Sequence, residues 1–233
     1  MRVAALIPAY DAARTVGEVV RGAGSAFEGL GAVYVVDDGS RDDTAARARE
    51  AGAVLLSHER NLGKGRALRT GLARAHADGH VAVVTIDADG QHPVDEAARL
   101  ARLDTDLEAL VLGVRHLGRA GAPRANRISN AISNGFLSLF SRTWLADTQC
   151  GLRRYPLPRA LELGGRDDGY AFEAEILLLV IAAGVPLVEL PVRVEYPADR
   201  TTHFDSVRDP MRVIRRVVTT LVSTRGITRP ARP

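Results

Sequence analysis

The sequence predicts an α/β fold, Rossmann-like, in which a mostly parallel sheet is covered by helices on both faces. Short apolar runs alternate with helix-like segments, the connections between them are short, and acidic or small residues recur where the runs end. The chain has 233 residues, 46% of them hydrophobic and 25% charged. This size and composition suit one large folded domain, which we expect over residues 1–200, followed by a basic C-terminal segment at 201–233.

The expected elements follow one another in a regular order along the first half of the chain. Each strand-like run is rich in aliphatic residues and ends near Gly, Pro or Asp, as buried strands do. The runs are VAALIP (3–8), AVYVVDD (32–38), AVLLSHE (53–59), VAVVTID (81–87) and LEALVLGV (107–114), and the helix-like segments lie near 14–24, 43–52, 64–78 and 94–103. In the second half we expect helices over 124–145 and 170–183 and then a strand in LVELPVRVEYP (187–197).

Composition excludes several classes of protein. Cys150 is the single cysteine, so an intrachain disulfide is impossible and a cysteine-based metal site is disfavoured. The first apolar run is too short for a signal peptide, and the longest apolar segment, 176–192, is interrupted by Gly184, Pro186 and Glu189. We therefore expect no membrane-spanning helix and a cytoplasmic location. The formal net charge of +3 is modest, and we expect no nucleic-acid partner.

The polar residues that follow the strand-like runs mark the expected site. In a parallel sheet, ligands collect at the carboxyl ends of the strands, where the chain turns. Those ends carry Pro8 to Tyr10, then Asp37, Asp38 and Gly39, then Asp87 to Asp89, and then Gly113 and Arg115.

The stretch VAVVTIDADGQHP (81–93) brings Asp87 and Asp89 out of an apolar run with one residue between them. Two unpaired carboxylates so close repel each other, and a divalent cation is the simplest relief. Gln91 adds a neutral oxygen ligand, and an oxygen-only ligand set favours Mg²⁺ or Mn²⁺ that bridges to the phosphates of a nucleotide. The alternative is that Asp89 caps a helix starting near Pro93, with Asp87 merely solvated.

Two further stretches fit a nucleotide at the same edge. Asp38 in VVDDGSRDDT (35–44) could accept the N3–H of a pyrimidine, and Tyr10 offers a ring on which a base could stack. The alternative for this stretch is a helix cap from Asp42 or Asp43. NLGKGRALRTGLARA (61–75) lacks the P-loop spacing and is interpreted as a loop near the nucleotide.

Seven motifs in this order resemble glycosyltransferase family 2, which has the GT-A fold, and within it the polyprenyl-phosphate (dolichyl-phosphate-type) mannosyl- and glucosyltransferases. The resemblance covers roughly residues 3–200. The motifs are IPAY, VVDDGS, NLGKGRAL, DADGQHP, NRISNAISN, DTQCGLRRY and GYAFEAEIL.

The resemblance implies a role for each matching position. Metal binding falls to Asp87, Asp89 and Gln91, with Ala88 between them facing the nucleotide sugar. Nucleoside binding falls to Tyr10 and Asp38, with Pro8 beside them and Asp37 as a substitute for Asp38. Diphosphate or acceptor phosphate would be bound by Arg115, Arg127 and Arg200, which together with Asp89 are the expected catalytic residues.

The resemblance also implies the reaction: metal-dependent, inverting transfer of a hexose, mannose or glucose, from a GDP or UDP sugar to polyprenyl phosphate. A lipid monophosphate has its second pKa near ~6, so it is already anionic and needs no general base. If the acceptor were instead a saccharide or small-molecule hydroxyl, the base would come from Asp167, Asp168, Glu173 or Glu175. A third hypothesis is a catalytically silent sugar-nucleotide-binding or scaffold protein.

The sequence departs from the family pattern in two places. Asp11 and Ala12 stand where the family usually has Asn-Glu. Related proteins often carry C-terminal membrane helices, and we expect none in this sequence. Residues 203–225 instead have an amphipathic basic pattern, which suits either peripheral contact with an anionic membrane, at its cytoplasmic face, or a helix packed on the core. The loop from His116 to Arg124 is expected to close over the donor or acceptor.

Overall fold

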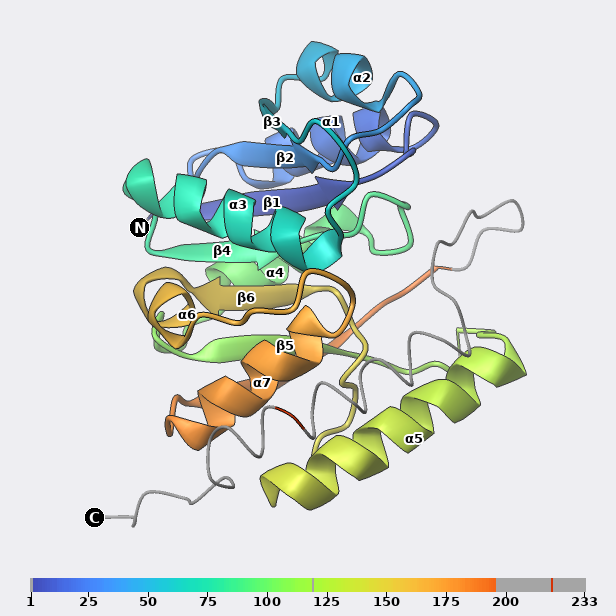
Figure 1. The fold of residues 1–233 in the computed structure, drawn as a ribbon, viewed down its shortest axis with the longest axis vertical. Coiled ribbons are helices and arrows are strands. Elements are labelled where there is room, and N and C mark those ends of the chain that lie inside the picture. Colours follow the sequence, from blue (N-terminus) through green and yellow to red (C-terminus); the bar gives the residue numbers. More distant parts are fainter. Residues whose placement is uncertain (1, 119, 196–218, 220–233) are drawn as a thin grey trace.

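The computed structural model of this protein describes residues 2–118 and 120–195, together with Thr219. Its centre is a seven-stranded sheet in the order β3-β2-β1-β4-β6-β5-β7 (Figure 1). The strands are β1 (Val3–Ala9), β2 (Val33–Asp37), β3 (Val54–Ser57), β4 (Ala82–Thr85), β5 (Leu110–Arg115), β6 (Arg153–Pro156) and β7 (Leu187–Val192). The α/β fold class with a mostly parallel sheet is confirmed.

Helices cover both faces of this sheet, as the sequence predicts, and each face has its own apolar core. One core contains side chains of α1 (Val16–Ala26), α2 (Thr44–Glu50) and α4 (Val94–Arg102). The other contains side chains of α3 (Lys64–Ala77), α5 (Arg124–Ser141), α6 (Leu157–Leu163) and α7 (Phe172–Ala182). The long helix α5 is shorter than predicted, because Arg142 adopts a left-handed backbone conformation (φ 52°) that ends it.

The strand β6 was missed by the sequence analysis, as was helix α6 after it. β6 runs antiparallel to both of its neighbours, β4 and β5, whereas the other pairs in the sheet are parallel. Its sequence is RRYP, which lacks the apolar character of a buried strand. Arg153 and Arg154 are nonetheless fully buried, because their guanidinium groups donate to backbone carbonyls of Glu173 (2.6 Å) and Asp106 (2.9 Å).

Several features expected near the C-terminus lie outside the described residues: Arg200, the 201–233 segment and its amphipathic pattern. Within the part of the chain that the structure describes, none of the helices has both the length and the apolarity needed to cross a membrane.

Helix α3 approaches β1 closely because Gly71 has no side chain. A Cβ at Gly71 would lie 2.2 Å from Cδ1 of Leu6, a buried side chain of β1. This close approach fixes the height of α3 above the sheet, and with it the position of the residues at the start of the helix.

We therefore expect Gly71→Ala to lower the free energy of unfolding by about 1–3 kcal/mol, through overpacking against Leu6. The matched control is Gly24→Ala in α1, where a Cβ meets nothing within 4 Å. Ala there gains up to about 1 kcal/mol of helix propensity without a clash. Urea unfolding of both variants measures the difference, and equal stabilities would contradict the close approach.

Candidate active site

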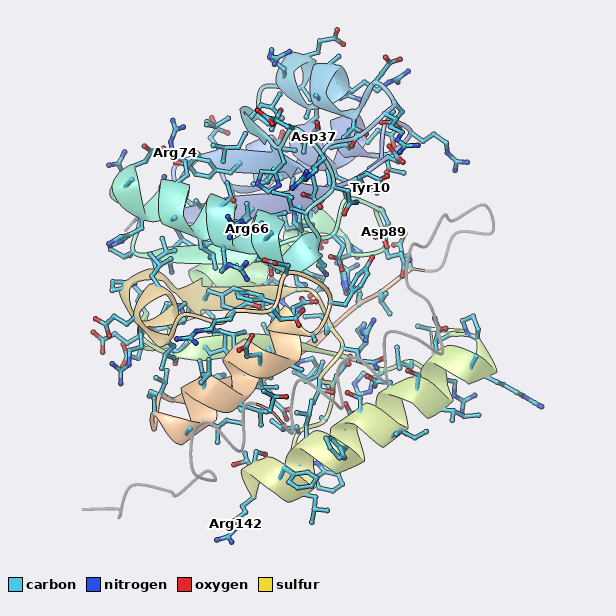
Figure 2. The ribbon with its side chains drawn as sticks, in the orientation of Figure 1. Tyr10, Asp37, Arg66, Arg74, Asp89 and Arg142 are labelled. Carbon is cyan, nitrogen blue, oxygen red and sulfur yellow. The ribbon has the colours of Figure 1, made fainter. Side chains whose placement is uncertain are left out.

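The acidic pair lies where the sequence places it, just past the carboxyl end of β4. Thr85 is the last residue of that strand, and its hydroxyl donates to the carbonyl of Gly151 (2.6 Å). Figure 2 shows Tyr10, which follows β1, and Asp89 at the same edge of the sheet. The strand-end edge predicted to hold the site therefore gathers residues from at least two neighbouring strands.

Asp87 is enclosed on both sides of its carboxylate. Its Oδ1 forms an ion pair with Nζ of Lys64 at 2.8 Å. Its Oδ2 faces Gly151, where a Cβ would lie only 2.3 Å away, so a larger residue at that position would displace the carboxylate. Lys64 Nζ also lies 3.1 Å from Oε2 of Glu173 and is therefore shared between two carboxylates.

The charges of these groups are set by their neighbours. Burial would raise the pKa of Asp87, but Lys64 beside it holds that pKa below its ordinary value. Burial would likewise lower the pKa of Lys64, yet Asp87 and Glu173 together raise it, so the ammonium stays charged. Among the residues that the structure describes, none forms an ion pair with Asp89: burial, and then the nearby charge of Asp87, raise its pKa to about 6.

Asp89 does not act as a helix cap. Its Oδ1 accepts a hydrogen bond from the backbone N–H of Gln91 (3.0 Å), which closes a local turn. Helix α4 begins at Val94 with Pro93 at its N-cap position and no side-chain cap. The alternative in which Asp89 caps this helix is therefore wrong.

Asp87, Asp89 and Gln91 offer oxygen ligands that fit a hard divalent ion. Among the described residues, no group of three or more His, Cys, Asp or Glu side chains could hold a metal ion by itself. If the amide of Gln91 joins the two carboxylates, as the sequence predicts, the three groups would form an open site that a ligand's phosphates would complete. The raised pKa of Asp89 fits this interpretation, because it reflects a repulsion that a cation would relieve.

Asp38 is oriented into the protein. Its Oδ1 lies 2.6 Å from Nδ1 of His58 and accepts from the N–H of Leu62 (3.0 Å), while its Oδ2 accepts from the N–H of Gly63 (2.7 Å). Both oxygens therefore hold the loop that leads into α3. Its neighbour Asp37 is also buried and accepts from the N–H of Ser40 (3.2 Å). A contact of either aspartate with a base stays a prediction, as does stacking on Tyr10, which is partly buried together with Pro8.

The glycines on either side of Lys64 allow the start of α3 to pack closely against the turn at 167–169. A Cβ at Gly63 would lie 2.2 Å from the carbonyl oxygen of Asp168, and one at Gly65 2.3 Å from that of Asp167. Gly63 also has a φ of 100°, which favours glycine. The turn at 167–169 therefore lies directly against the start of α3 and fixes Lys64 beside Asp87.

The carboxylates considered as bases all have partners within the protein. Oε2 of Glu175 accepts from the N–H groups of Arg166 and Asp167, both at 2.8 Å. Asp167 accepts from the N–H of Gly169 (2.8 Å), and Asp168 pairs with Arg69. Glu173 is buried and pairs with Lys64.

Arg115, at the end of β5, is fixed by Asp147. The guanidinium donates to both oxygens of this fully buried carboxylate, at 2.7 Å and 3.0 Å, and the backbone N–H of Arg115 donates to it as well (3.1 Å). Arg127 is exposed in the first turn of α5. The structure thus brings Asp87, Asp89, Lys64 and Glu173 together, whereas the phosphate contacts of Arg115, Arg127 and Arg200 stay predictions.

Three residues of this site were missed as individual positions, although the motifs that contain them were recognised. They are Lys64, Asp147 and Gly151. The signal for Lys64 was its place as the chain's single lysine between two glycines. The signal for Asp147 and Gly151 was the motif DTQCG, which starts and ends with them.

Comparison with known proteins identifies the family of this chain. The family model of glycosyl transferase family 2 matches residues 4–155. This chain therefore belongs to glycosyl transferase family 2, and the resemblance inferred from its motifs is confirmed.

Several relatives of this chain are named for transfer of a sugar to dolichyl or undecaprenyl phosphate. Dolichyl-phosphate beta-glucosyltransferase ALG5C of Trichomonas vaginalis is 29% identical over 213 residues, which cover 80% of this chain and 62% of that protein. Glycosyltransferase AglJ of Haloferax volcanii is 28% identical over 213 residues, 89% of this chain and 68% of that protein. The dolichyl- and undecaprenyl-phosphate names agree with the polyprenyl-phosphate branch predicted from the motifs.

Solved structures share the fold. Glucosyl-3-phosphoglycerate synthase of Mycobacterium tuberculosis, in complex with Mn²⁺, UDP and phosphoglyceric acid, superposes with a TM-score of 0.71 at 22% identity, over 98% of this chain and 79% of that one. Mannosyl-3-phosphoglycerate synthase of Rubrobacter xylanophilus gives a TM-score of 0.70 at 22% identity, over 100% of this chain and 79% of that one.

The net upward shift in the pKa of Asp89 means that its negative charge should cost stability when no metal is bound. Because its pKa is raised from 3.8 to about 6, the folded protein binds more protons than the unfolded chain between these values, and stability falls as pH rises through this window. We expect Asp89→Asn to stabilise the EDTA-treated protein at pH 7.5 by up to about 3 kcal/mol, with the gain disappearing near pH ~4.

Thermal unfolding across this pH range measures the effect, and Asp104→Asn, at an exposed aspartate elsewhere, is the control. A gain for Asp89→Asn that is as large at the acidic end as at pH 7.5 would contradict the assigned charge state.

Proposed function

We propose that this chain is a metal-dependent, inverting glycosyltransferase that moves a hexose, mannose or glucose, from a GDP or UDP sugar to polyprenyl phosphate at the cytoplasmic face of a membrane. Membership of glycosyl transferase family 2 supports the reaction class. The observation that carries the donor half is the pair Asp87 and Asp89 at the end of β4, with Lys64 ion-paired to the first of them.

The donor would bind through charge. Asp87, Asp89 and Gln91 would hold Mg²⁺ or Mn²⁺, which supplies charge neutralisation for the departing nucleoside diphosphate. Lys64 and Arg115 add two cationic groups at the same edge, each already oriented by a carboxylate. Structures of the same fold contain Mn²⁺ or Mg²⁺ together with UDP, which supports this choice of ion and ligand.

The acceptor is inferred from the carboxylates around the site and from the relatives. A phosphate acceptor needs no general base, because it is already ionised at neutral pH. The four carboxylates considered as bases instead pair with Lys64, Arg69 or backbone N–H groups. Relatives named for dolichyl or undecaprenyl phosphate support the same acceptor class. The acceptor oxygen would attack the anomeric carbon opposite the leaving diphosphate, which inverts its configuration.

A hydroxyl acceptor is the alternative. The solved structures named above belong to synthases of glucosyl- and mannosyl-3-phosphoglycerate, but their identity to this chain supports only a shared fold. A silent binding protein is disfavoured because Asp87, Asp89 and Gln91 are all present.

A partition assay separates these hypotheses. Radiolabelled GDP and UDP sugars are incubated with the protein, polyprenyl phosphate and Mn²⁺, and the mixture is extracted with organic solvent. We expect label in the organic phase. Label confined to an aqueous product would favour the hydroxyl acceptor, and nucleotide binding without transfer would favour the silent protein.

Asp89→Ala should abolish metal-dependent nucleotide binding, because Asp87 is already ion-paired with Lys64 and cannot hold the ion alone. Calorimetry with UDP or GDP, with and without Mn²⁺, measures the loss, which we expect to exceed about tenfold in Kd. Asp104→Ala serves as the control. Nucleotide affinity that is the same for wild type and Asp89→Ala in Mn²⁺ would count against the metal site.

A further inference from the structure

Helix α5 places polar side chains toward the protein and large apolar side chains outward, the reverse of the usual arrangement in a surface helix. Its serines and an asparagine face the protein, where they bind the segment 145–149. Ser133 Oγ lies 2.8 Å from Oγ1 of Thr148, and Ser138 Oγ accepts from the N–H of Leu145 (3.0 Å). Asn134 donates to the carbonyl of Ala146 (2.6 Å) and accepts from the N–H of Thr148 (2.8 Å). Polar groups therefore occupy most of the inner side of the helix, together with the fully buried Leu137.

Large apolar side chains occupy the outer side. Ile128 is 60% exposed, Ile132 58% and Leu139 73%, and they recur at helical spacing along one face. Trp144, just past the end of the helix, is 84% exposed. Among the described residues, the exposed large hydrophobic side chains all lie between 128 and 144 except Val81. A soluble surface does not gather such residues in one place without a partner.

The charges around this face indicate the partner. From residue 116 to residue 146 the sequence contains no Asp or Glu, but it contains four arginines. Arg124 and Arg127 are exposed in the first turn of α5, and Arg142 is exposed just past its other end, where Figure 2 shows it pointing away from the sheet. An apolar centre with an exposed tryptophan and basic ends matches the interface of a bilayer with anionic headgroups.

We propose that a second functional surface, the α5 surface, lies against a lipid bilayer that carries anionic headgroups. It consists of Ile128, Ile132, Leu139 and Trp144 with Arg124, Arg127 and Arg142. This proposal rests on the proposed function and adds to it a surface for the membrane that carries the acceptor. Helix α5 follows β5 in the chain, and β5 ends at Arg115, a predicted phosphate-binding residue. A bilayer along α5 would bring the acceptor's phosphate toward the strand-end edge where the donor binds.

The chain contains a single tryptophan, Trp144, which reports directly on this surface. Vesicles of phosphatidylcholine with phosphatidylglycerol, added to the full chain, should shift its emission to shorter wavelength and protect it from acrylamide. Phosphatidylcholine alone should give a smaller change, and high salt should weaken the effect. Emission that is unchanged by anionic vesicles would overturn the proposal, even if the protein sediments with them through residues 203–225.

A double variant tests the apolar face itself. Ile132→Ser with Leu139→Ser should weaken vesicle binding by at least about tenfold, since two apolar side chains leave the interface. Val81→Ser, which changes the exposed apolar side chain outside this surface, should bind as wild type does. Thermal midpoint and elution volume of the double variant should stay unchanged. A lower midpoint, or loss of a dimer, would show that residues 203–225 or a second copy cover this face, and would overturn the proposal.

Failure of the α5 surface and failure of the proposed function give different results. With a short, water-soluble prenyl phosphate, the double variant should transfer sugar as wild type does. With long-chain polyprenyl phosphate embedded in vesicles, it should lose most of its activity. Equal activity of wild type and variant on the embedded acceptor would overturn only the proposal that the α5 surface binds a bilayer. A wild type whose Trp144 enters vesicles but which transfers sugar to neither acceptor would overturn the proposed function alone.

Discussion

The ion pair between Lys64 and Asp87 is the interaction on which the arrangement of the site depends. Lys64 stands at the first residue of α3, and its ammonium lies between Asp87 after β4 and Glu173 on α7. One cation is thus shared by two carboxylates, and within the described part of the chain Asp89 has no ion-pair partner of its own, with a pKa raised to about 6. The protein therefore holds an acidic site that is only partly neutralised, which is the condition for binding a further cation with its phosphate ligand.

The surrounding chain is shaped to permit this arrangement. Gly63, Gly65 and Gly151 each lie where a Cβ would collide, within 2.3 Å, with the turn at 167–169 or with the carboxylate of Asp87. Asp38 also fixes the loop before α3, because its carboxylate accepts from the N–H groups of Leu62 and Gly63. A half-neutralised acidic pair costs stability, and the close contacts of these glycines keep it in place.

A second network of hydrogen bonds fixes the end of β5 and the segment before β6. Asp147 accepts two hydrogen bonds from the guanidinium of Arg115. A few residues later, Arg153 of β6 donates to the carbonyls of Cys150 (2.9 Å) and Glu173 (2.6 Å). The segment 145–149, between α5 and β6, also binds the polar side of α5. The position of α5, and the outward direction of its exposed apolar residues, therefore follow from the same segment that orients Arg115.

Much of the fold was predictable because apolar runs and their spacing report which residues are buried. The strands β1 to β5 and β7, and the helices α1 to α5 and α7, agree with the sequence analysis within a few residues. The strand β6 was not predictable in this way, because RRYP is buried only through guanidinium bonds to distant carbonyls. The C-terminal end of α5 was predicted too late in the chain, because Arg142 adopts a left-handed conformation that an arginine rarely adopts.

The sequence by itself determined that an acidic pair follows a buried strand, and its motifs indicated the enzyme family. Only the tertiary structure decided which carboxylate has a counter-charge, because Lys64, Asp87 and Glu173 are far apart in the chain and meet only where α3, β4 and α7 converge. The same holds for α5: the sequence predicted a helix over 124–145, and only the contacts of Ser133, Asn134 and Ser138 show which side faces the protein. Local patterns fix what a residue can do, whereas the charge state of a carboxylate and the exposed side of a helix depend on neighbours that folding brings from elsewhere.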